Sequence, residues 1–324
     1  MFPRLRLAYQ HRIPRTFIVN KPSSSLRSGC AYVGAARHLA FFVLLSFAAC
    51  LPAVAIGRPQ VVVVPVANMY SGPSEKTDVV SQAIYGNNVV LLTSRGEWSR
   101  IQTSDQYKGW TPSRYLRIVQ SGDGYATSGR IVLVDSLFAN VYREPDVTRH
   151  KPVIMIPFES RLEVIDEGTG ENEGWLQVNL PTKEAAWIQS GDVTSQGKTL
   201  TIAESIELAK RFLGLPYLWG GRSSFGYDCS GFTQMLVRLR GANMPRDADK
   251  QAAWKGVVAV ERKDLQAGDL VFFGSNAKDI THTGMYIGDG QFIHDSTHGH
   301  PTVQIGRLDD PPWSSLLVAC RRVK

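Results

Sequence analysis

An internal repeat restricts the fold of the first half of the chain more than any other feature. A segment that begins at Ala67-Asn68 returns at Ala139-Asn140, and each copy is followed by two tryptophans that lie twelve residues apart. These are Trp98 and Trp110 in the first copy, and Trp175 and Trp187 in the second. Short alternating apolar runs between turn residues indicate strands, and two copies are fewer than the roughly three that a stacked solenoid needs. We therefore expect two small closed β barrels, over residues 58–120 and 128–196, with all four tryptophans in their cores.

The last part of the chain, residues 199–324, has a different pattern. Thr201 followed by Glu204 forms a capping box at the start of a helix that ends near Gly214. A second helix is expected from Asp228 to about Arg240 and a short third one from Asp247. Strands are expected over residues 270–273, 284–287, 291–294, 302–305 and 316–321. Helices followed by strands indicate an α+β domain.

The formal net charge of +7 comes from the N-terminal leader, residues 1–57. Residues 1–37 hold seven of the 36 Lys and Arg residues and no acidic residue, so the rest of the chain has equal numbers of basic and acidic residues. A neutral body attracts nucleic acid weakly, and no nucleic-acid partner is expected.

An apolar run, residues 39–56, follows the basic stretch and ends in Ala53-Val54-Ala55. This pattern is typical of a secretory signal peptide that is cleaved after Ala55. A retained membrane anchor or lipidation at Cys50 are the alternatives. Each version predicts an exported protein, periplasmic or extracellular, that contacts a membrane only through a retained leader.

Removal of the leader would leave two cysteines, Cys229 and Cys320, in an oxidising compartment. Either they form a disulfide or one is kept as a thiol for chemistry. Cys320 lies in an apolar run that indicates a buried strand, whereas Cys229 lies in a polar, glycine-rich turn. With Asp228 as N-cap, Cys229 would occupy the first helical turn, where the helix dipole lowers a thiol pKa. We therefore expect Cys320 in the core and Cys229 as the reactive residue.

A base for this thiol must come from the histidines later in the chain. His282 and His294 lie on two expected strands joined by an Asp289-Gly290 hairpin turn. In this arrangement, one imidazole can accept the thiol proton while the other orients it. His298 and His300 lie in a polar loop and are expected in solvent. Zinc bound by these side chains is an alternative, but the spacing lacks a compact ligand pattern, so no metal or other cofactor is expected.

Five motifs of the last domain identify a resemblance to a known family. They are Pro216-Tyr217-x-Trp219-Gly220-Gly221, Asp228-Cys229-Ser230-Gly231, Pro245-Arg246-Asp247, Gly268-Asp269-Leu270-Val271-Phe272-Phe273 and His282-x-Gly284-x-Tyr286-Ile287-Gly288. In this order they resemble the NlpC family of papain-like cell-wall cysteine peptidases over residues 199–324. The repeats resemble bacterial SH3-like domains, which extends the resemblance to about residue 58. The layout is similar to that of γ-D-glutamyl-L-diamino-acid endopeptidases.

The resemblance implies roles for four catalytic residues. Cys229 matches the nucleophile and His282 the base. His294 matches the residue that orients the base, and Tyr217 matches a tyrosine that helps to hold the oxyanion.

Substrate contacts are implied in the same way. Asp228 and Ser230 match positions that contact the free amino end of the substrate, and Tyr107 matches a tyrosine of the first SH3-like domain that closes this pocket. Arg246 is expected to bind substrate as well. The pocket also needs an acid from the first barrel, for which Glu75 and Asp78 are candidates. Ala248 stands where some relatives have a serine, which leaves the peptide preference open.

The expected function is hydrolysis of peptidoglycan stem peptides or muropeptides at the γ-D-Glu–diamino acid bond, through a thioester on Cys229. The implied substrates carry a free N-terminal L-Ala. Two alternatives stay open: an amidase or acyl transferase that uses the same cysteine, and a non-catalytic protein that binds cell wall through its SH3-like repeats. The presence of Cys229, His282 and His294 together argues against the second alternative.

Overall fold

The computed structural model describes residues 57–119, 124–195, 197 and 199–324. The expected signal sequence, its cleavage site and Cys50 lie outside these ranges. None of the helices in the described ranges is long and apolar enough to cross a membrane.

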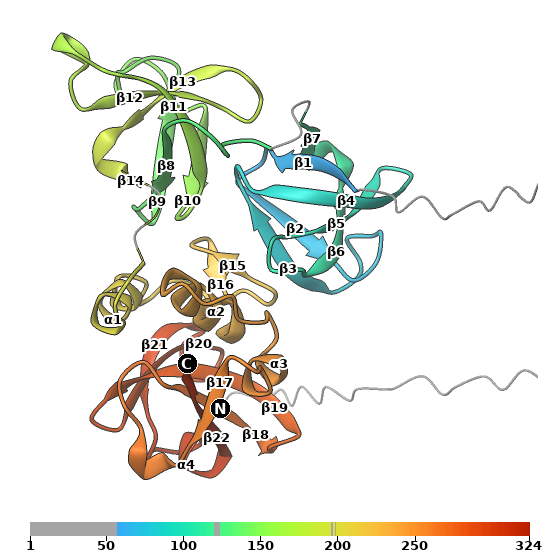
Figure 1. Cartoon of the computed structure of the whole chain (residues 1–324), viewed down its shortest axis with the longest axis vertical. Helices are drawn as coiled ribbons and strands as arrows, with labels where there is room; N and C mark the ends of the chain where they lie inside the picture. Colours follow the sequence, from blue (N-terminus) through green and yellow to red (C-terminus); the bar gives the residue numbers. More distant parts are fainter. Residues whose placement is uncertain (1–56, 120–123, 196, 198) are drawn as a thin grey trace, which may run out of the picture. The chain divides into compact units, whose positions relative to one another are not determined.

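The first β domain is one seven-stranded antiparallel sheet with the order β3-β2-β6-β5-β4-β1-β7 (Figure 1). Its strands are β1 (Arg58–Val62), β2 (Val66–Tyr70), β3 (Val79–Ile84), β4 (Asn88–Arg95), β5 (Trp98–Gln102), β6 (Lys108–Pro112) and β7 (Leu116–Ile118). Buried side chains from five of these strands form one core, which includes Val62, Met69, Ala83, Val89 and Ile101. The sheet therefore curves around its own core, with β3 and β7 as its edges.

The second β domain repeats this arrangement with the order β10-β9-β13-β12-β11-β8-β14. Its strands are β8 (Ile131–Val134), β9 (Phe138–Tyr142), β10 (Ile154–Pro157), β11 (Arg161–Glu167), β12 (Trp175–Asn179), β13 (Ala185–Gln189) and β14 (Val193–Ser195). Strand for strand, the order matches that of the first domain. The sequence repeat thus corresponds to a repeat of topology.

The expectation that the four tryptophans fill the two cores is wrong. All four are half-buried, and neither β-domain core includes them. Trp98 instead meets the ring of Tyr70 edge-to-face at 5.6 Å, and Trp175 meets Tyr142 in the same way at 5.5 Å. These small cores are filled mainly by Val, Ala, Ile, Leu and Met, and the indole rings lie outside them.

The C-terminal domain has a six-stranded sheet with the order β17-β22-β18-β19-β20-β21 and helices packed against it (Figure 1). Its elements are α1 (Ile202–Arg211), β15 (Arg222–Ser223), β16 (Gly226–Tyr227), α2 (Cys229–Leu239), α3 (Ala248–Ala252), β17 (Val257–Val260), β18 (Leu270–Asn276), β19 (Asp279–Gly288), β20 (Gln291–Ser296), β21 (Thr302–Arg307), α4 (Trp313–Leu316) and β22 (Leu317–Val323). The predicted helix starts are confirmed, including the capping box at Thr201 and Glu204. The hairpin β15–β16, strand β17 and helix α4 were not expected.

Polar contacts join both β domains to the C-terminal domain. From the first β domain, Gln82 accepts hydrogen bonds from the backbone N–H of Arg222 and the hydroxyl of Ser223. From the second, Glu159 receives two hydrogen bonds from Arg238 of α2, at 2.6 and 2.5 Å. Phe158, next to Glu159, belongs to the hydrophobic core of the C-terminal domain.

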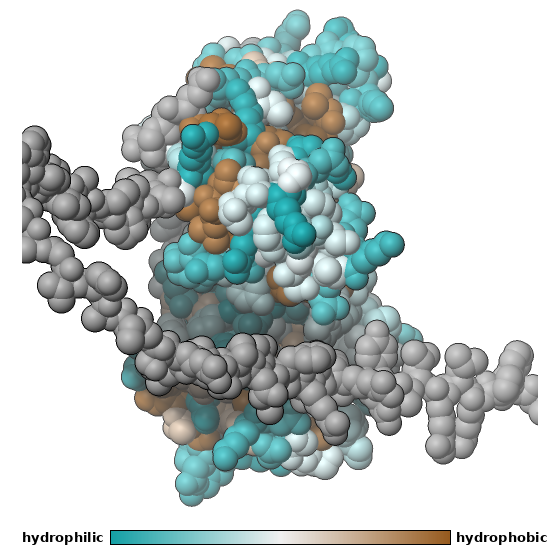
Figure 2. Space-filling view, turned by 90° about the vertical axis from the view of Figure 1, so that its right-hand side faces the viewer, coloured by the Kyte–Doolittle hydropathy of each residue, from teal (hydrophilic) through white to brown (hydrophobic). Residues whose placement is uncertain are grey.

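Exposed hydrophobic side chains are distributed over all three domains, for example Ile118, Ile165 and Leu218. On the face shown in Figure 2, they form separate patches between hydrophilic residues. Single exposed hydrophobic residues are normal on a protein surface.

Candidate active site

The candidate nucleophile opens helix α2. Asp228 is the N-cap, and its carboxylate accepts the backbone N–H of Gly231 at 2.7 Å. Cys229 is therefore the first helical residue, at the positive end of the helix dipole. Its side chain is 7% exposed, and both Cys229 and Cys320 are free thiols. Cys320 lies in a hydrophobic core under the sheet, as expected.

Two histidines form a pair on the sheet beside this helix. His282 lies on β19 and His294 on β20, and Nε2 of His282 lies 2.7 Å from Nδ1 of His294. Gly284 makes this approach possible, because a Cβ atom at that position would lie 3.0 Å from the Cβ of His294. The hairpin predicted from the sequence therefore brings the two imidazoles into direct contact.

Aromatic rings enclose the histidine pair. Trp313 of α4 stacks on His282 at 5.0 Å and meets His294 edge-to-face at 4.8 Å. Phe273 and Phe292 pack against the same two rings. Trp313 was not predicted as a site residue, because nothing local to it indicates that α4 folds over the histidines.

Burial sets the protonation of the thiol and the base. It lowers the pKa of His282 to about 3 and that of His294 well below the usual value. Burial, and after it the charge of Asp228, raises the pKa of Cys229 to about 12, although the backbone N–H of Thr283 favours the anion. The expectation of a depressed thiol pKa is therefore wrong for the buried thiol in this structure. Desolvation outweighs the helix dipole, and both groups are neutral near pH 7.

Tyr217 lies near Cys229 and Asp228. Burial, and then the neighbouring Cys229 and Asp228, raises the pKa of its phenol far above the ordinary value. The hydroxyl therefore stays protonated, as a hydrogen-bond donor must.

Asp228, Ser230 and Arg246 form one buried network. Arg246 is 3% exposed and donates two hydrogen bonds to the Asp228 carboxylate, at 2.9 and 2.7 Å, and one to the Ser230 hydroxyl at 2.7 Å. Asp228 also accepts the backbone N–H of Gly220 at 3.0 Å. Arg246 therefore holds the Asp228 carboxylate in place at the N-terminus of α2.

Tyr107 reaches this region from the first β domain. Its hydroxyl donates to the carboxylate of Asp247, at 3.2 Å to Oδ1. Asp247 is half-buried and precedes α3 without capping it through its side chain. Sequence reasoning missed Asp247 as a site residue although it belongs to a quoted motif, because only the fold reveals its contact with Tyr107.

Within the described residues, neither acid proposed from the first β domain makes a side-chain hydrogen bond or ion pair with the C-terminal domain, although Val79, next to Asp78, packs closely against Gly220. Glu75 is exposed and pairs with Arg114 at 3.8 Å, and Asp78 is exposed as well. Asp105 of this domain does contact the C-terminal domain, since its carboxylate accepts a hydrogen bond from Gln234 of α2 at 3.1 Å.

The remaining histidines of the domain, His298 and His300, are exposed as predicted. Across the described ranges, no group of three or more His, Cys, Asp and Glu side chains could hold a metal ion. Ala248 is the first residue of α3.

A thiol at a helix N-terminus, next to a histidine pair on an antiparallel sheet, defines the class of papain-like cysteine peptidases. Residues 214–322 match the NlpC/P60 family, and residues 65–117 match the bacterial SH3 domain. The chain is 34% identical to a "Gamma-D-glutamyl-L-lysine dipeptidyl-peptidase" of Bacillus cereus, over 75% of this chain and 74% of the relative. A Bacillus subtilis protein of the same name is 31% identical over 75% of this chain and 81% of that protein.

A solved structure of an NlpC/P60 family protein from Bacillus cereus superimposes with a TM-score of 0.72 at 27% identity, over 82% of this chain and 99% of that one. The protein belongs to the NlpC/P60 family, and it is a cysteine peptidase.

Proposed function

We propose that this protein is a cysteine endopeptidase that cuts peptidoglycan stem peptides between D-glutamate and the diamino acid, in peptides with a free N-terminal L-Ala. The observation that carries the proposal is the contact between Tyr107 and Asp247, next to a nucleophile and a histidine pair of the expected type. The names of the two Bacillus relatives support the same bond.

The hydrogen bond between the histidines defines the first chemical step. If Nε2 of His282 donates to Nδ1 of His294, Nδ1 of His282 is left to accept the thiol proton. The sulfur of Cys229 attacks the γ-carbonyl carbon of D-glutamate as that proton leaves. Because both groups are neutral before this step, the charge separates only with substrate bound.

The tetrahedral oxyanion then needs hydrogen-bond donors. The backbone N–H of Cys229 at the helix start and the hydroxyl of Tyr217 are the donors that we assign. Collapse breaks the carbon–nitrogen bond, and the proton on His282 passes to the leaving amine of the diamino acid. The acyl group stays on Cys229 as a thioester.

Water completes the reaction. His282 accepts a proton from a water molecule that attacks the thioester, and the proton returns to the sulfur as the γ-carboxyl product leaves. His294 keeps the imidazole oriented through both halves of the cycle.

Asp228 and Asp247 differ in how many hydrogen bonds their carboxylates already accept. Five hydrogen bonds already occupy the carboxylate of Asp228, whereas the Asp247 carboxylate accepts, within the described part of the chain, only the Tyr107 hydroxyl. We therefore assign Asp247 as the partner of the α-ammonium group of L-Ala. Asp228, Ser230 and Arg246 would shape the floor of the same pocket. An acylated amine has no positive charge to offer Asp247.

The test is to incubate the full chain with L-Ala-γ-D-Glu-diaminopimelate and to identify the products by mass spectrometry. We expect L-Ala-D-Glu and free diaminopimelate, no product with Cys229→Ala, and at least about a tenfold lower kcat/KM for the N-acetylated peptide, since one charged contact is lost. Absence of scission, or scission at another bond, would contradict the proposal.

We also propose that the protein is exported and that the second β domain is a second SH3-like domain. The basic stretch and apolar run of the leader support export, and the shared strand order supports the domain assignment. Mass spectrometry of the exported protein is expected to give an N-terminus at Ile56, whereas an N-terminus at Met1 would indicate a retained anchor.

A further inference from the structure

A cavity of about 270 Å³ lies where both β domains meet the C-terminal domain. Its lining includes Arg161 and Glu159 from the second β domain, and Arg222 and Arg238 from the C-terminal domain. None of Cys229, His282, Tyr107 and Asp247 borders it, so this cavity is separate from the candidate active site.

The charges around the cavity do not balance. Three guanidinium groups line it, but Glu159 is the one carboxylate in the lining, and Arg238 takes both of its oxygens. Asp105 lies behind the lining, 4.0 Å from Arg222, and it also accepts hydrogen bonds from Thr103 and Gln234. Even with both acids included, one positive charge is left over.

Arg161 has no ion pair among the described residues, and Arg222 has only the one with Asp105, at 4.0 Å. The side chain of Arg222 is 9% exposed, and among the described residues its one side-chain hydrogen bond runs from Nε to Gln234, at 3.2 Å. Within the described residues its two terminal nitrogens make no hydrogen bond, and Asp105 lies 4.0 Å from Nη2. Burial, and then repulsion from Arg238, lowers the pKa of this guanidinium. A buried cation without a full set of partners is costly to the fold.

Arg161 of the second β domain is the third arginine in the lining. It is half-buried, and its side chain makes one hydrogen bond, from Nη1 to the carbonyl of Ala126 at 3.0 Å. Its backbone carbonyl lies so close to Gly86 that a Cβ atom there would approach it to 2.4 Å. Gly86 has φ +76, so glycine is favoured at this contact for two reasons.

We propose that this cavity is a binding site for a small oxyanion, a phosphate or a carboxylate, held between Arg161 and Arg222. Planar guanidinium groups match the oxygens of such anions and bind them in a bidentate way. The volume lies near the lower end of the range of ligand pockets, which begins at about 300 Å³. A tetrahedral anion or a short dicarboxylate fits this volume, and a nucleotide is too large.

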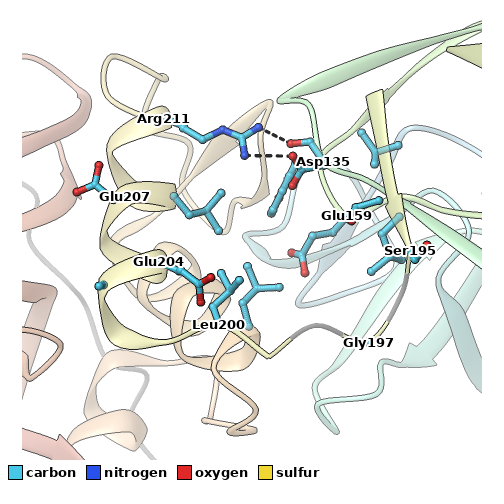
Figure 3. A pocket seen from close by; sticks show the side chains of 15 residues that line it. Asp135, Glu159, Ser195, Gly197, Leu200, Glu204, Glu207 and Arg211 are labelled. Carbon is cyan, nitrogen blue, oxygen red and sulfur yellow. Dashed lines mark hydrogen bonds and ion pairs between the residues drawn. The ribbon is translucent and has the colours of Figure 1, made fainter. Parts of the chain in front are cut away.

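A second cavity differs from the first because its charged side chains have partners. It has a volume of about 710 Å³ and lies between the second β domain and α1 (Figure 3). Its charged groups already have partners: Arg211 binds Asp135 and Glu204 caps α1. It therefore carries no ligand proposal.

The test is calorimetric titration of the full chain with inorganic phosphate, and separately with succinate, at constant ionic strength. Arg161→Gln removes one half of the proposed site at a half-buried position, and Arg114→Gln is the matched control at an exposed position. We expect the Kd of the favoured anion to rise at least tenfold in Arg161→Gln and to stay within twofold in Arg114→Gln. The anion with the lower Kd, phosphate or succinate, identifies the class of ligand.

Crystals grown in the favoured anion give a second measurement that does not depend on a variant. Density for the anion between Arg161 and Arg222 is expected. Equal Kd values for Arg161→Gln and the unmodified protein would overturn the proposal. So would a cavity that holds only water, or an anion found only at the surface as an adventitious ion.

Discussion

At the scale of single residues, the histidine pair connects the geometry most directly to the chemistry. In the proposed mechanism, His294 is hydrogen-bonded to His282 and takes no direct part in the proton transfer. We expect His294→Gln to lower kcat by about 100-fold or more, since an imidazole without its orienting partner adopts the wrong tautomer or direction. KM is expected to change less than threefold, an estimate that follows from the lack of substrate contact.

Steady-state kinetics on the L-Ala-γ-D-Glu-diaminopimelate peptide would check this. His300→Gln is the control, because this side chain is exposed and is expected to leave both constants unchanged. A large rise in KM with normal kcat in His294→Gln would show that His294 contacts substrate instead.

Asp295 is a buried acid that the proposed mechanism does not use. It is 0% exposed, and neither carboxyl oxygen has a hydrogen-bond partner among the described residues. Burial, and then the charge of Asp228, raises its pKa to about 8. Tyr217 also interacts with its charge. Asp295 is therefore protonated in the folded protein at neutral pH.

This raised pKa predicts how stability depends on pH. An unfolded aspartate has a pKa of about 3.9, so between about pH 4 and pH 8 the folded state holds a proton that the unfolded chain has lost. The free energy of unfolding therefore falls as pH rises through this window. Asp295→Asn imitates the protonated form and does not titrate. We therefore expect the difference in free energy of unfolding between this variant and the unmodified protein to be about 2–4 kcal/mol larger, in favour of the variant, at pH 8 than at pH 5.

Urea unfolding at both pH values would measure the difference. Asp310→Asn provides the control, because this aspartate is exposed in the same domain; its offset from the unmodified protein is expected to be the same at pH 5 and pH 8. A constant offset for Asp295→Asn would mean that Asp295 is ionised in the folded state.

At the scale of helices and strands, the hairpin β19–β20 depends on one missing side chain. A Cβ atom at Gly284 would lie 2.8 Å from a ring carbon of Phe292 and 3.0 Å from the Cβ of His294. We expect Gly284→Ala to destabilise the protein by about 1–3 kcal/mol, as overpacking does, and to lower kcat because His294 must shift.

Denaturant unfolding and kinetics together would test this. Gly191→Ala is the control, since nothing lies within 4 Å of a Cβ atom at that position, and its stability is expected to change by less than about 0.5 kcal/mol. Unchanged stability and kcat in Gly284→Ala would mean that the hairpin adapts without cost.

Elements were predictable from the sequence where a local signal sets them. The capping box of α1, the N-cap of α2 and the Asp289-Gly290 turn act over a few residues, and the structure has all three. Strand β17 has two exposed and two half-buried residues in the order Val-Val-Ala-Val, so its sequence lacks the alternation that marks a strand. The prediction that the tryptophans lie in the cores failed for a related reason. The sequence alone does not show which side of a curved sheet a large apolar residue covers.

At the scale of the whole molecule, the interfaces were the least predictable part. Cys229 and the histidines stand out because their own neighbours in the sequence are unusual. Asp247, Trp313 and Arg222 gain their significance from residues far away in the chain, such as Tyr107 for Asp247, so no local pattern marks them. The site thus depends on packing between domains that the sequence pattern alone does not fix.

The same interface predicts how the first β domain contributes to specificity. Burial, and then the charge of Asp247, raises the pKa of Tyr107 to about 12, so its hydroxyl remains a donor to that carboxylate. Tyr107→Phe removes this bond and leaves Asp247 free to turn away from the pocket. For a peptide with a free amine we expect kcat/KM to fall at least about tenfold, the size of one hydrogen bond to a charged group. The N-acetylated peptide, which has no ammonium group to bind, is expected to change less than about twofold by the same argument.

Tyr115→Phe is the matched control in the same domain, because its hydroxyl contacts only Arg114 among the described residues. Competition between free and acetylated peptides, followed by mass spectrometry, gives the ratio of the two kcat/KM values directly. An equal loss on both peptides would assign Tyr107 to the support of the catalytic residues. A loss confined to the free peptide means that the β domain takes part in choosing the substrate, which explains why an enzyme whose chemistry lies in one domain keeps a second one against its active site.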